Sequence, residues 1–383
     1  MYLHLNIFIC LLFLTGCVGL GDDNTPTPTP LTAYPFQFQP VLLWSVATGR
    51  GMDDDYLRLG PVIQQNQIFV ASKSGLITAL EPAHGHKLWQ KNIKQIITSG
   101  PAVKDGIIII VTKQPQAIAL AADTGNVLWR AMLPNQVLAP PAIGQGQVIF
   151  KTVDGQILAF ELHEGTSLWT YEHGSPMLIL RSSSAPKIVD NKLVVGFSDG
   201  RLAAFNLKNG NLLWERTIAF PQGATAADQL IDIAADPILS HNVIYVVTYQ
   251  GQLAAISLRS GQVLWQRNFS SYSGLTVGNS LYVTDTKGVV WAFNRSTGEL
   301  LWQQQFLRHR NLTAPTIFGN SLIIGDQEGY IHWLAQSDGH PLARDIVHDD
   351  ASIIATPLVD YPMVYILTRE GGLSAWTHTT LPV

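Results

Sequence analysis

A short pattern recurs along this chain and restricts its possible folds more than any other feature. Each copy opens with Gly, carries a small and then an apolar residue four and five positions later, places a second Gly at position ten, and ends in Leu-Trp. Apolar residues alternate within each copy, and the Thr-Gly or Ser-Gly step before its last segment is typical of a β-hairpin. Five copies are complete: 75–89, 155–169, 200–214, 251–265 and 288–302.

Three altered copies bring the number of units to eight. The copy at 115–129 opens with Pro115, and the copy at 329–343 has Ala343 where the others have Trp. The eighth begins at Gly371 and the chain ends before its last strand, but a strand-like segment at 41–49 carries the missing Leu-Trp. We therefore expect the N-terminal strand to complete the last unit.

Two further strand-like segments precede each copy, so every unit has four short strands. Four strands recurring every 40 or so residues are typical of a propeller blade. The sequence thus predicts an all-β fold, an eight-bladed β-propeller of four-stranded antiparallel blades at 41–383. We expect the repeated Trp residues to pack between blades rather than to stack on a ligand, since each ring has a large apolar area to bury.

The N-terminus indicates export and lipid anchoring. Residues 1–16 form a short apolar run that suits a signal peptide, although no Lys or Arg precedes it. Leu14-Thr15-Gly16-Cys17 resembles a bacterial lipobox, which implies a lipid on Cys17; the alternative is an ordinary signal peptide with an incidental Cys. Residues 17–40 are rich in Pro and Thr and predict an extended, poorly ordered tether. No other cofactor is expected, and Val18 after the Cys implies the outer membrane by resemblance to other lipoproteins.

Charge argues against nucleic acid as a partner. Only 14% of the residues are charged and the formal net charge is −4. No cluster of Lys and Arg is present that would neutralise a phosphate backbone.

Two connections between blades are longer than the rest, at 171–184 and 216–234. They flank the same blade, and function concentrates in such surface segments. The first contains Met177-Leu178-Ile179-Leu180-Arg181, an apolar run ending in Arg, and the second carries carboxylates. We interpret the pair as a protein-docking patch. Alternatively, Leu178 and Leu180 fold inward to plug the ring while Arg181 pairs with Asp232.

These features together resemble the outer-membrane β-barrel assembly lipoproteins, the BamB family. The resemblance is carried by the lipobox, the blades and the stretches 178–186, 258–267 and 323–334. It implies a non-enzymatic scaffold at the periplasmic face of the outer membrane that binds the periplasmic domains of the barrel insertase BamA. It also implies that Leu178, Leu180, Arg181 and Asp232 bind this partner. Ala234 stands where the family has a second acid, and Asp228 or Asp236 is a candidate substitute.

Other functions have weaker support in the sequence. The stretch 119–129 also resembles the blade motif of pyrroloquinoline-quinone dehydrogenases, but adjacent cysteines are absent. A propeller that binds a small ligand at its channel is a second alternative, and capture of unfolded outer-membrane proteins at blade edges is a possible extra role. The acidic run 52–56 lacks the spacing of a calcium loop. His84 and His86 share a turn between outer strands, and no third metal ligand is assigned to them.

Overall fold

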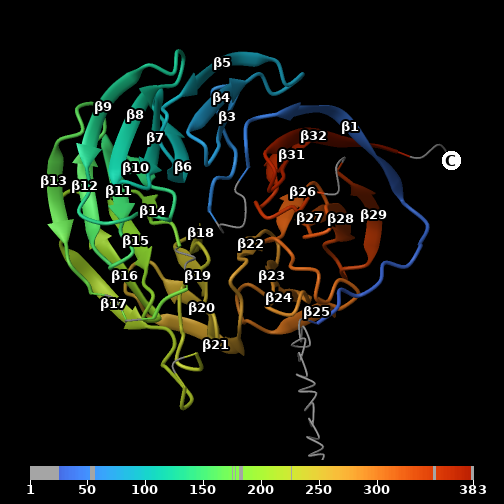
Figure 1. Ribbon diagram of the computed structural model, residues 1–383. Helices are drawn as coiled ribbons and strands as arrows, with labels where there is room; N and C mark the ends of the chain where they lie inside the picture. Colours follow the sequence, from blue (N-terminus) through green and yellow to red (C-terminus); the bar gives the residue numbers. More distant parts are fainter. Residues whose placement is uncertain are drawn as a thin grey trace, which may run out of the picture.

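The structure is a computed structural model that describes residues 26–51, 57–174, 176, 178–180, 184–225, 227–347 and 351–380. Regular secondary structure in these ranges consists of 32 strands in eight four-stranded sheets. The sheets are arranged around a common centre (Figure 1), which confirms the predicted all-β, eight-bladed propeller. The described residues include no helix long and apolar enough to cross a membrane. The predicted signal peptide and Cys17 lie outside these ranges.

We number the blades along the chain. Blades 1 to 4 contain β2 (Val62–Gln64), β3 (Gln67–Ala71), β4 (Leu76–Leu80), β5 (Lys87–Asn92); β6 (Ile97–Lys104), β7 (Ile107–Thr112), β8 (Gln116–Ala121), β9 (Val127–Met132); β10 (Ala142–Gly144), β11 (Gln147–Lys151), β12 (Ile157–Glu161), β13 (Ser167–Tyr171); and β14 (Lys187–Val189), β15 (Lys192–Gly196), β16 (Arg201–Asn206), β17 (Leu212–Thr217). Blades 5 to 8 contain β18 (Ile238–Ser240), β19 (Val243–Val247), β20 (Gly251–Ser257), β21 (Val263–Phe269); β22 (Leu275–Val277), β23 (Leu281–Thr284), β24 (Val290–Phe293), β25 (Leu300–Gln304); β26 (Thr316–Phe318), β27 (Ser321–Gly325), β28 (Tyr330–Ala335), β29 (Pro341–Ile346); and β30 (Leu358–Asp360), β31 (Met363–Leu367), β32 (Gly372–Thr380), β1 (Phe38–Ala47).

The two ends of the described chain close the ring together. The antiparallel ladder between β1 and β32 runs from Phe38 opposite Thr380 to Ala47 opposite Gly372, with one irregularity near Trp44. The N-terminal strand is therefore the outermost strand of blade 8, as the orphan Leu-Trp segment predicts. The ring closes through main-chain hydrogen bonds between segments more than three hundred residues apart.

Each outer-strand Trp packs on the next blade. Seven such indoles donate Nε1–H to a main-chain carbonyl there at 2.9–3.0 Å. Below each ring lies a Gly with φ of +68° to +75°, where a Cβ would come within 2.4–2.7 Å of the indole. Only Gly fits because both the left-handed backbone and the close approach exclude a side chain. The Trp residues are thus inter-blade packing groups, as expected.

Blade 7 has the two residues of this cross-strand pair exchanged. In the other blades an Ala of the third strand lies opposite the outer-strand Trp, as Ala79 does opposite Trp89. In blade 7, Trp333 occupies the third strand and lies opposite Ala343, and Trp333 is 1% exposed. The cross-strand pair therefore contains the same two residue types, but the Trp333 indole N–H has no regular hydrogen-bond partner among the described residues, so the carbonyl contact of the other Trp residues is not repeated.

The N-terminal segment before β1 is extended and lies against the propeller. Thr29 N–H donates to the Arg308 carbonyl at 3.0 Å, and Gln37 N–H donates to the Leu342 carbonyl at 2.8 Å. Leu31 packs with the buried cluster between blades 6 and 7. We call residues 26–37 the N-terminal strap. The described part of the predicted tether is thus bound along blades 6 and 7 by main-chain and apolar contacts.

Candidate partner-binding site

The first long connection, between β13 and β14, begins at His173, whose side chain is held by its neighbours in blade 4. The His173 ring stacks on Phe197 with centroids 3.7 Å apart, and its Nε2 lies 3.0 Å from Asp199. Beyond His173 the connection reaches Leu178, which is 49% exposed, and then Leu180, which is partly buried. Met177 and Arg181 lie outside the described residues, so the proposed pairing of Arg181 with Asp232 does too.

The two leucines of this connection have different environments. Leu180 lies over a small pocket at the junction of blades 3 and 4, whereas Leu178 does not line it. The pocket is lined by Leu138, Lys151, Thr152, Val153, Gly155, Ile179, Leu180, Phe197 and Ser198. Leu178 therefore presents its side chain to solvent, while Leu180 covers the polar groups below the connection.

The second long connection, between β17 and β18, has an exposed part and a buried part. Phe220 is 68% exposed and residues 221–225 after it are exposed as well, whereas Ile218 and Ala219 before it are buried. Ile231 and Ile233 are buried, and Tyr249 N–H donates to the Asp232 carbonyl at 2.8 Å, which fixes the returning chain. Sequence reasoning did not single out Phe220, although one aromatic residue in a polar connection was a visible signal.

Asp232 is fully buried where the two connections meet. Its carboxylate oxygens have no regular hydrogen-bond partner among the described residues. Burial raises the pKa of Asp232 to about 6, although the charge of Lys151, the Ser198 hydroxyl and the Leu180 main-chain N–H partly counteract the rise. Asp232 thus lies behind Leu180 in the isolated chain and does not reach the surface.

Lys151 supplies the positive charge in this buried region. Its Nζ donates to the Ser184 hydroxyl at 3.1 Å and to the Gly196 carbonyl at 2.7 Å. Burial lowers the pKa of Lys151 to about 8, although Asp232 and Asp236 favour its charged form. The buried region below the two connections therefore contains two opposite charges, Lys151 and Asp232, that attract each other without forming a close salt bridge.

The two acids that could substitute for Ala234 lie in different environments. Asp236 is paired, since its carboxylate accepts from Arg58 at 2.5 Å, from Lys187 at 2.9 Å and from the Ala185 N–H at 2.7 Å. Although burial opposes it, the Arg58 and Lys187 charges hold the pKa of Asp236 far below its usual value.

Asp228 is exposed, and its carboxylate accepts from the Thr225 hydroxyl at 2.7 Å and the Thr225 N–H at 3.2 Å. It is consequently the acid of the second connection that faces solvent.

Comparison with known proteins places the chain in a family. Residues 73–304 and 286–381 match the family model described as outer membrane protein assembly factor BamB. The BamB proteins of Legionella pneumophila (strain Paris) and Pseudomonas aeruginosa are 38% and 39% identical over 98% of this chain, covering 99% and 98% of their own lengths. The Escherichia coli K12 protein is 30% identical over 97% of each chain.

Solved structures share the fold of this chain, and one of them is a BamB protein. BamB from Moraxella catarrhalis superposes with a TM-score of 0.80 at 28% identity, covering 88% of this chain and 100% of that one. A quinohemoprotein alcohol dehydrogenase from Comamonas testosteroni has a TM-score of 0.72 over 90% of this chain and 78% of that one, but its 12% identity indicates a shared fold alone. The chain belongs to the BamB family of outer membrane protein assembly factors.

Proposed function

We propose that this protein is a non-enzymatic scaffold, anchored through a lipid on Cys17 at the periplasmic face of the outer membrane. In this role it docks on the periplasmic domains of a BamA-like barrel insertase and promotes insertion of outer-membrane proteins. The proposal extends the assembly-factor role of the family to a named surface. No cofactor besides the lipid is required.

The observation that carries the proposal is the convergence of the two long connections. They expose Leu178 on one side and Phe220 on the other, at 49% and 68% of their surface. Apolar side chains presented by neighbouring connections suit the centre of a protein interface, where such groups contribute most of the binding energy. Full burial of Leu178 would contribute about 1.5–3 kcal/mol.

Arg181 and Asp228 are proposed to supply the charged contacts of this interface. Exposed charges at an interface mainly set orientation and association rate. Asp228 then takes the role that the family gives to an acid at the position of Ala234. We propose that Asp232 acts from below the surface, as a buried charge beside the Leu180 main chain, rather than by touching the partner.

Photo-crosslinking tests the surface directly. A photoreactive residue at Leu178, in the native membrane, should give an adduct with the insertase, identified by mass spectrometry. The matched control is Met132, which is 66% exposed on the outer strand of blade 2 and should give none. An adduct from Met132 alone would exclude docking through the connections. Adducts with unfolded outer-membrane proteins instead would favour a client-binding role.

The enzyme alternative has its own measurement. A quinoprotein would release a cofactor with visible absorbance when it is denatured. We expect denatured, purified protein to release none, and recovery of a quinone in equal amount to the chain would contradict the scaffold proposal.

A further inference from the structure

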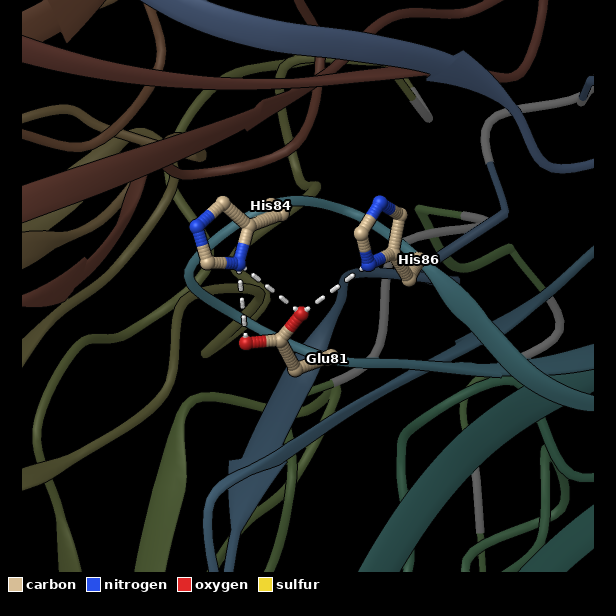
Figure 2. Close-up of side chains that lie close together, drawn as sticks. All are labelled: Glu81, His84 and His86. Carbon is tan, nitrogen blue, oxygen red and sulfur yellow. Dashed lines mark hydrogen bonds and ion pairs between the residues drawn. The ribbon is translucent and has the colours of Figure 1, made fainter.

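The turn between β4 and β5 brings together three metal-ligating side chains: Glu81, His84 and His86. Their ligand atoms all lie within 4.8 Å of one another, which is the case for no other His, Cys, Asp and Glu group in the described ranges. Figure 2 shows one ring nitrogen of each His directed at the Glu81 carboxylate. The two His residues stood out in the sequence, but Glu81, which stands only three residues before His84 in the same turn, was missed.

The two distances from the His nitrogens to the Glu81 carboxylate are close to the ligand spacing around a tetrahedral zinc ion. His84 Nδ1 lies 3.2 Å from Glu81 Oε2, and His86 Nδ1 lies 3.5 Å from the same oxygen. Two ligands bound at about 2.0–2.1 Å in tetrahedral geometry are about 3.3–3.4 Å apart. Both ring nitrogens thus lie within ion-pair distance of the same carboxylate.

The main chain of this turn is held in place. Glu81 N–H donates to the His86 carbonyl at 2.8 Å, and Gly85 N–H donates to the Glu81 carbonyl at 2.9 Å. The Pro82 carbonyl accepts from the Trp44 indole at 3.0 Å and from the Tyr365 hydroxyl at 3.4 Å, both in blade 8. The ligands therefore project from a fixed backbone, and binding an ion would order little beyond three side chains.

Blades 2 to 7 have this turn without the three ligands. The residues equivalent to Glu81, His84 and His86 are Ala121, Thr124 and Asn126; Glu161, Glu164 and Thr166; Asn206, Asn209 and Asn211; Ser257, Ser260 and Gln262; Asn294, Thr297 and Glu299; and Ala335, Asp338 and His340. Blade 7 has the same main-chain hydrogen bonds, with His340 Nδ1 at 2.5 Å from Asp338 Oδ1, but Ala335 replaces the first ligand. The fold thus does not require this set, and blade 7 provides a matched control.

We propose that Glu81, His84 and His86 bind one Zn²⁺. Two imidazoles and a carboxylate suit zinc, whereas Ca²⁺ and Mg²⁺ prefer oxygen ligands. Both rings are largely exposed, with 69% and 80% of the side-chain surface accessible, so a fourth position is open to water. The ion would tie the turn of blade 1 closed over Trp44, which belongs to the strand that completes the ring. The site is on blade 1, whereas the proposed docking surface flanks blade 4.

Calorimetric titration of zinc into EDTA-treated full-length protein in detergent tests this proposal. We expect one saturable site and a higher melting temperature with zinc. His84→Ala and His86→Ala should each weaken binding at least tenfold and remove the thermal shift, and Glu81→Gln should weaken it too. His340→Ala, in the equivalent turn of blade 7, should bind as the wild type does.

Zinc K-edge absorption on the wild type provides a second measurement that requires no variant to fold. It should show two imidazole ligands with oxygen completing the shell. The site is excluded if the wild type shows no saturable binding, if the His84→Ala/His86→Ala double variant binds equally well, or if Glu81→Gln has no effect. Insertase crosslinking at Leu178 should be the same with and without zinc, so the docking proposal and the zinc site fail independently.

Discussion

Asp326 in blade 7 and Asp232 beside blade 4 are both fully buried, yet their environments are opposite. Asp326 accepts from Arg310 Nε at 2.6 Å, from His332 Nε2 at 2.9 Å and from two main-chain N–H groups at 2.9 Å. Asp232 has no regular hydrogen bond within the described residues. A buried charge with all its partners in place is costly to break, because removing one partner leaves the others unpaired, whereas a poorly paired buried charge is itself destabilising.

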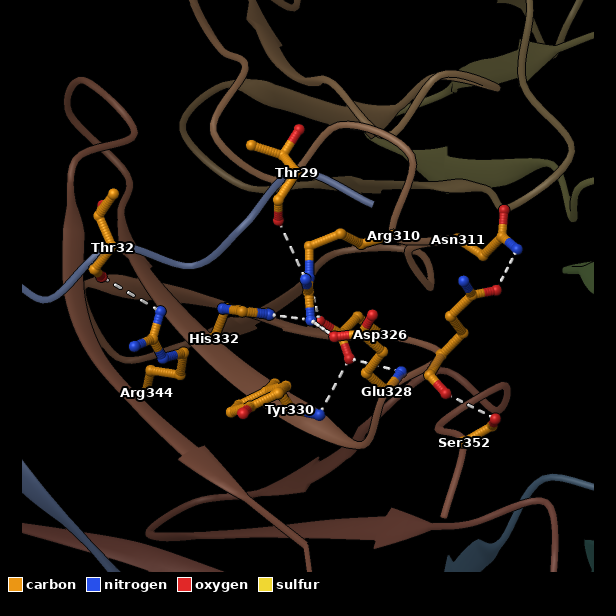
Figure 3. A network of polar contacts seen from close by, with 11 residues as sticks. Thr29, Thr32, Arg310, Asn311, Asp326, Glu328, Tyr330, His332, Arg344 and Ser352 are labelled. Atoms are coloured by element: carbon orange, nitrogen blue, oxygen red, sulfur yellow. Dashed lines mark hydrogen bonds and ion pairs between the residues drawn. The ribbon is translucent and has the colours of Figure 1, made fainter. Parts of the chain in front are cut away.

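The paired centre in blade 7 also holds the N-terminal strap (Figure 3). Arg310, which is 2% exposed, donates through Nη1 to the Thr29 carbonyl at 3.1 Å and through Nη2 to Glu328 at 2.6 Å. Although burial opposes ionisation of Asp326, the hydrogen bonds and charges of His332 and Arg310 hold its pKa below the usual value. The comparison indicates two uses of buried charge. In blade 7 the charges of Asp326 and Arg310 bind the N-terminal strap to the propeller, whereas Asp232 lies beneath the exposed connections beside blade 4.

Removing the paired carboxylate should have the largest effect. Asp326→Ala leaves the buried Arg310 and His332 without their acceptor, and we expect a loss of about 3–5 kcal/mol in the free energy of unfolding. Urea denaturation measures this. The double variant Asp326→Leu/Arg310→Met should recover part of the loss, because it removes both charges. A loss below about 1 kcal/mol for Asp326→Ala would mean that the network is not a stabilising centre.

Neutralising the poorly paired carboxylate should act in the opposite direction. The folded-state pKa of Asp232 is about 6, above the unfolded value of 3.8. The protonated form is therefore favoured by folding, and this stability is complete below about pH 4 and lost as the pH rises through 6. Asp232→Asn should consequently raise the free energy of unfolding by about 1–3 kcal/mol at pH 7, since each pKa unit corresponds to about 1.4 kcal/mol and Lys151 loses a partner.

The pH dependence distinguishes this effect from a packing change. The difference between Asp232→Asn and the wild type should be near zero at pH 4 and should develop between pH 4 and 7. Asp228→Asn, on the exposed part of the same connection, should show no such gain. A destabilised Asp232→Asn protein at pH 7 would indicate that the ionised carboxylate has a compensating partner.

The sequence predicted the ring well because its packing unit is local and periodic. The Gly and Trp positions specify the turn and the contact between blades at seven of the eight junctions, and even the exchange at Trp333 and Ala343 is visible as a Trp four residues after Gly329. The burial of Asp232 was not predictable, because it depends on the path of a connection without periodicity. Glu81, in contrast, stands three residues before His84 in a turn that the repeat specifies, so the sequence did contain a signal for the third ligand.

Loosening the N-terminal strap should have a smaller effect than either aspartate. The Arg344 guanidinium lies 5.5 Å from the Tyr34 ring centre and 5.6 Å from that of Tyr330, and it donates to the Thr32 carbonyl at 3.4 Å. Arg344→Ala should cost about 1 kcal/mol. It should also increase amide hydrogen exchange within residues 26–37 without affecting blade 4. Arg201→Ala, which removes a surface arginine from blade 4, should leave exchange in the strap unchanged.

The smallest effect on stability is expected at Leu178, and there it separates binding from folding. Because its side chain is half exposed and does not line the pocket, Leu178→Ser should change the melting temperature little but weaken binding to the insertase by about tenfold or more. Leu180→Ser should lower both, since Leu180 covers Lys151 and Phe197. Equal loss of stability in both variants would mean that the connection is part of the core. A stable Leu178→Ser protein with normal binding would show that the insertase binds elsewhere. The burial of the poorly paired Asp232 would then not be explained by a docking surface above it.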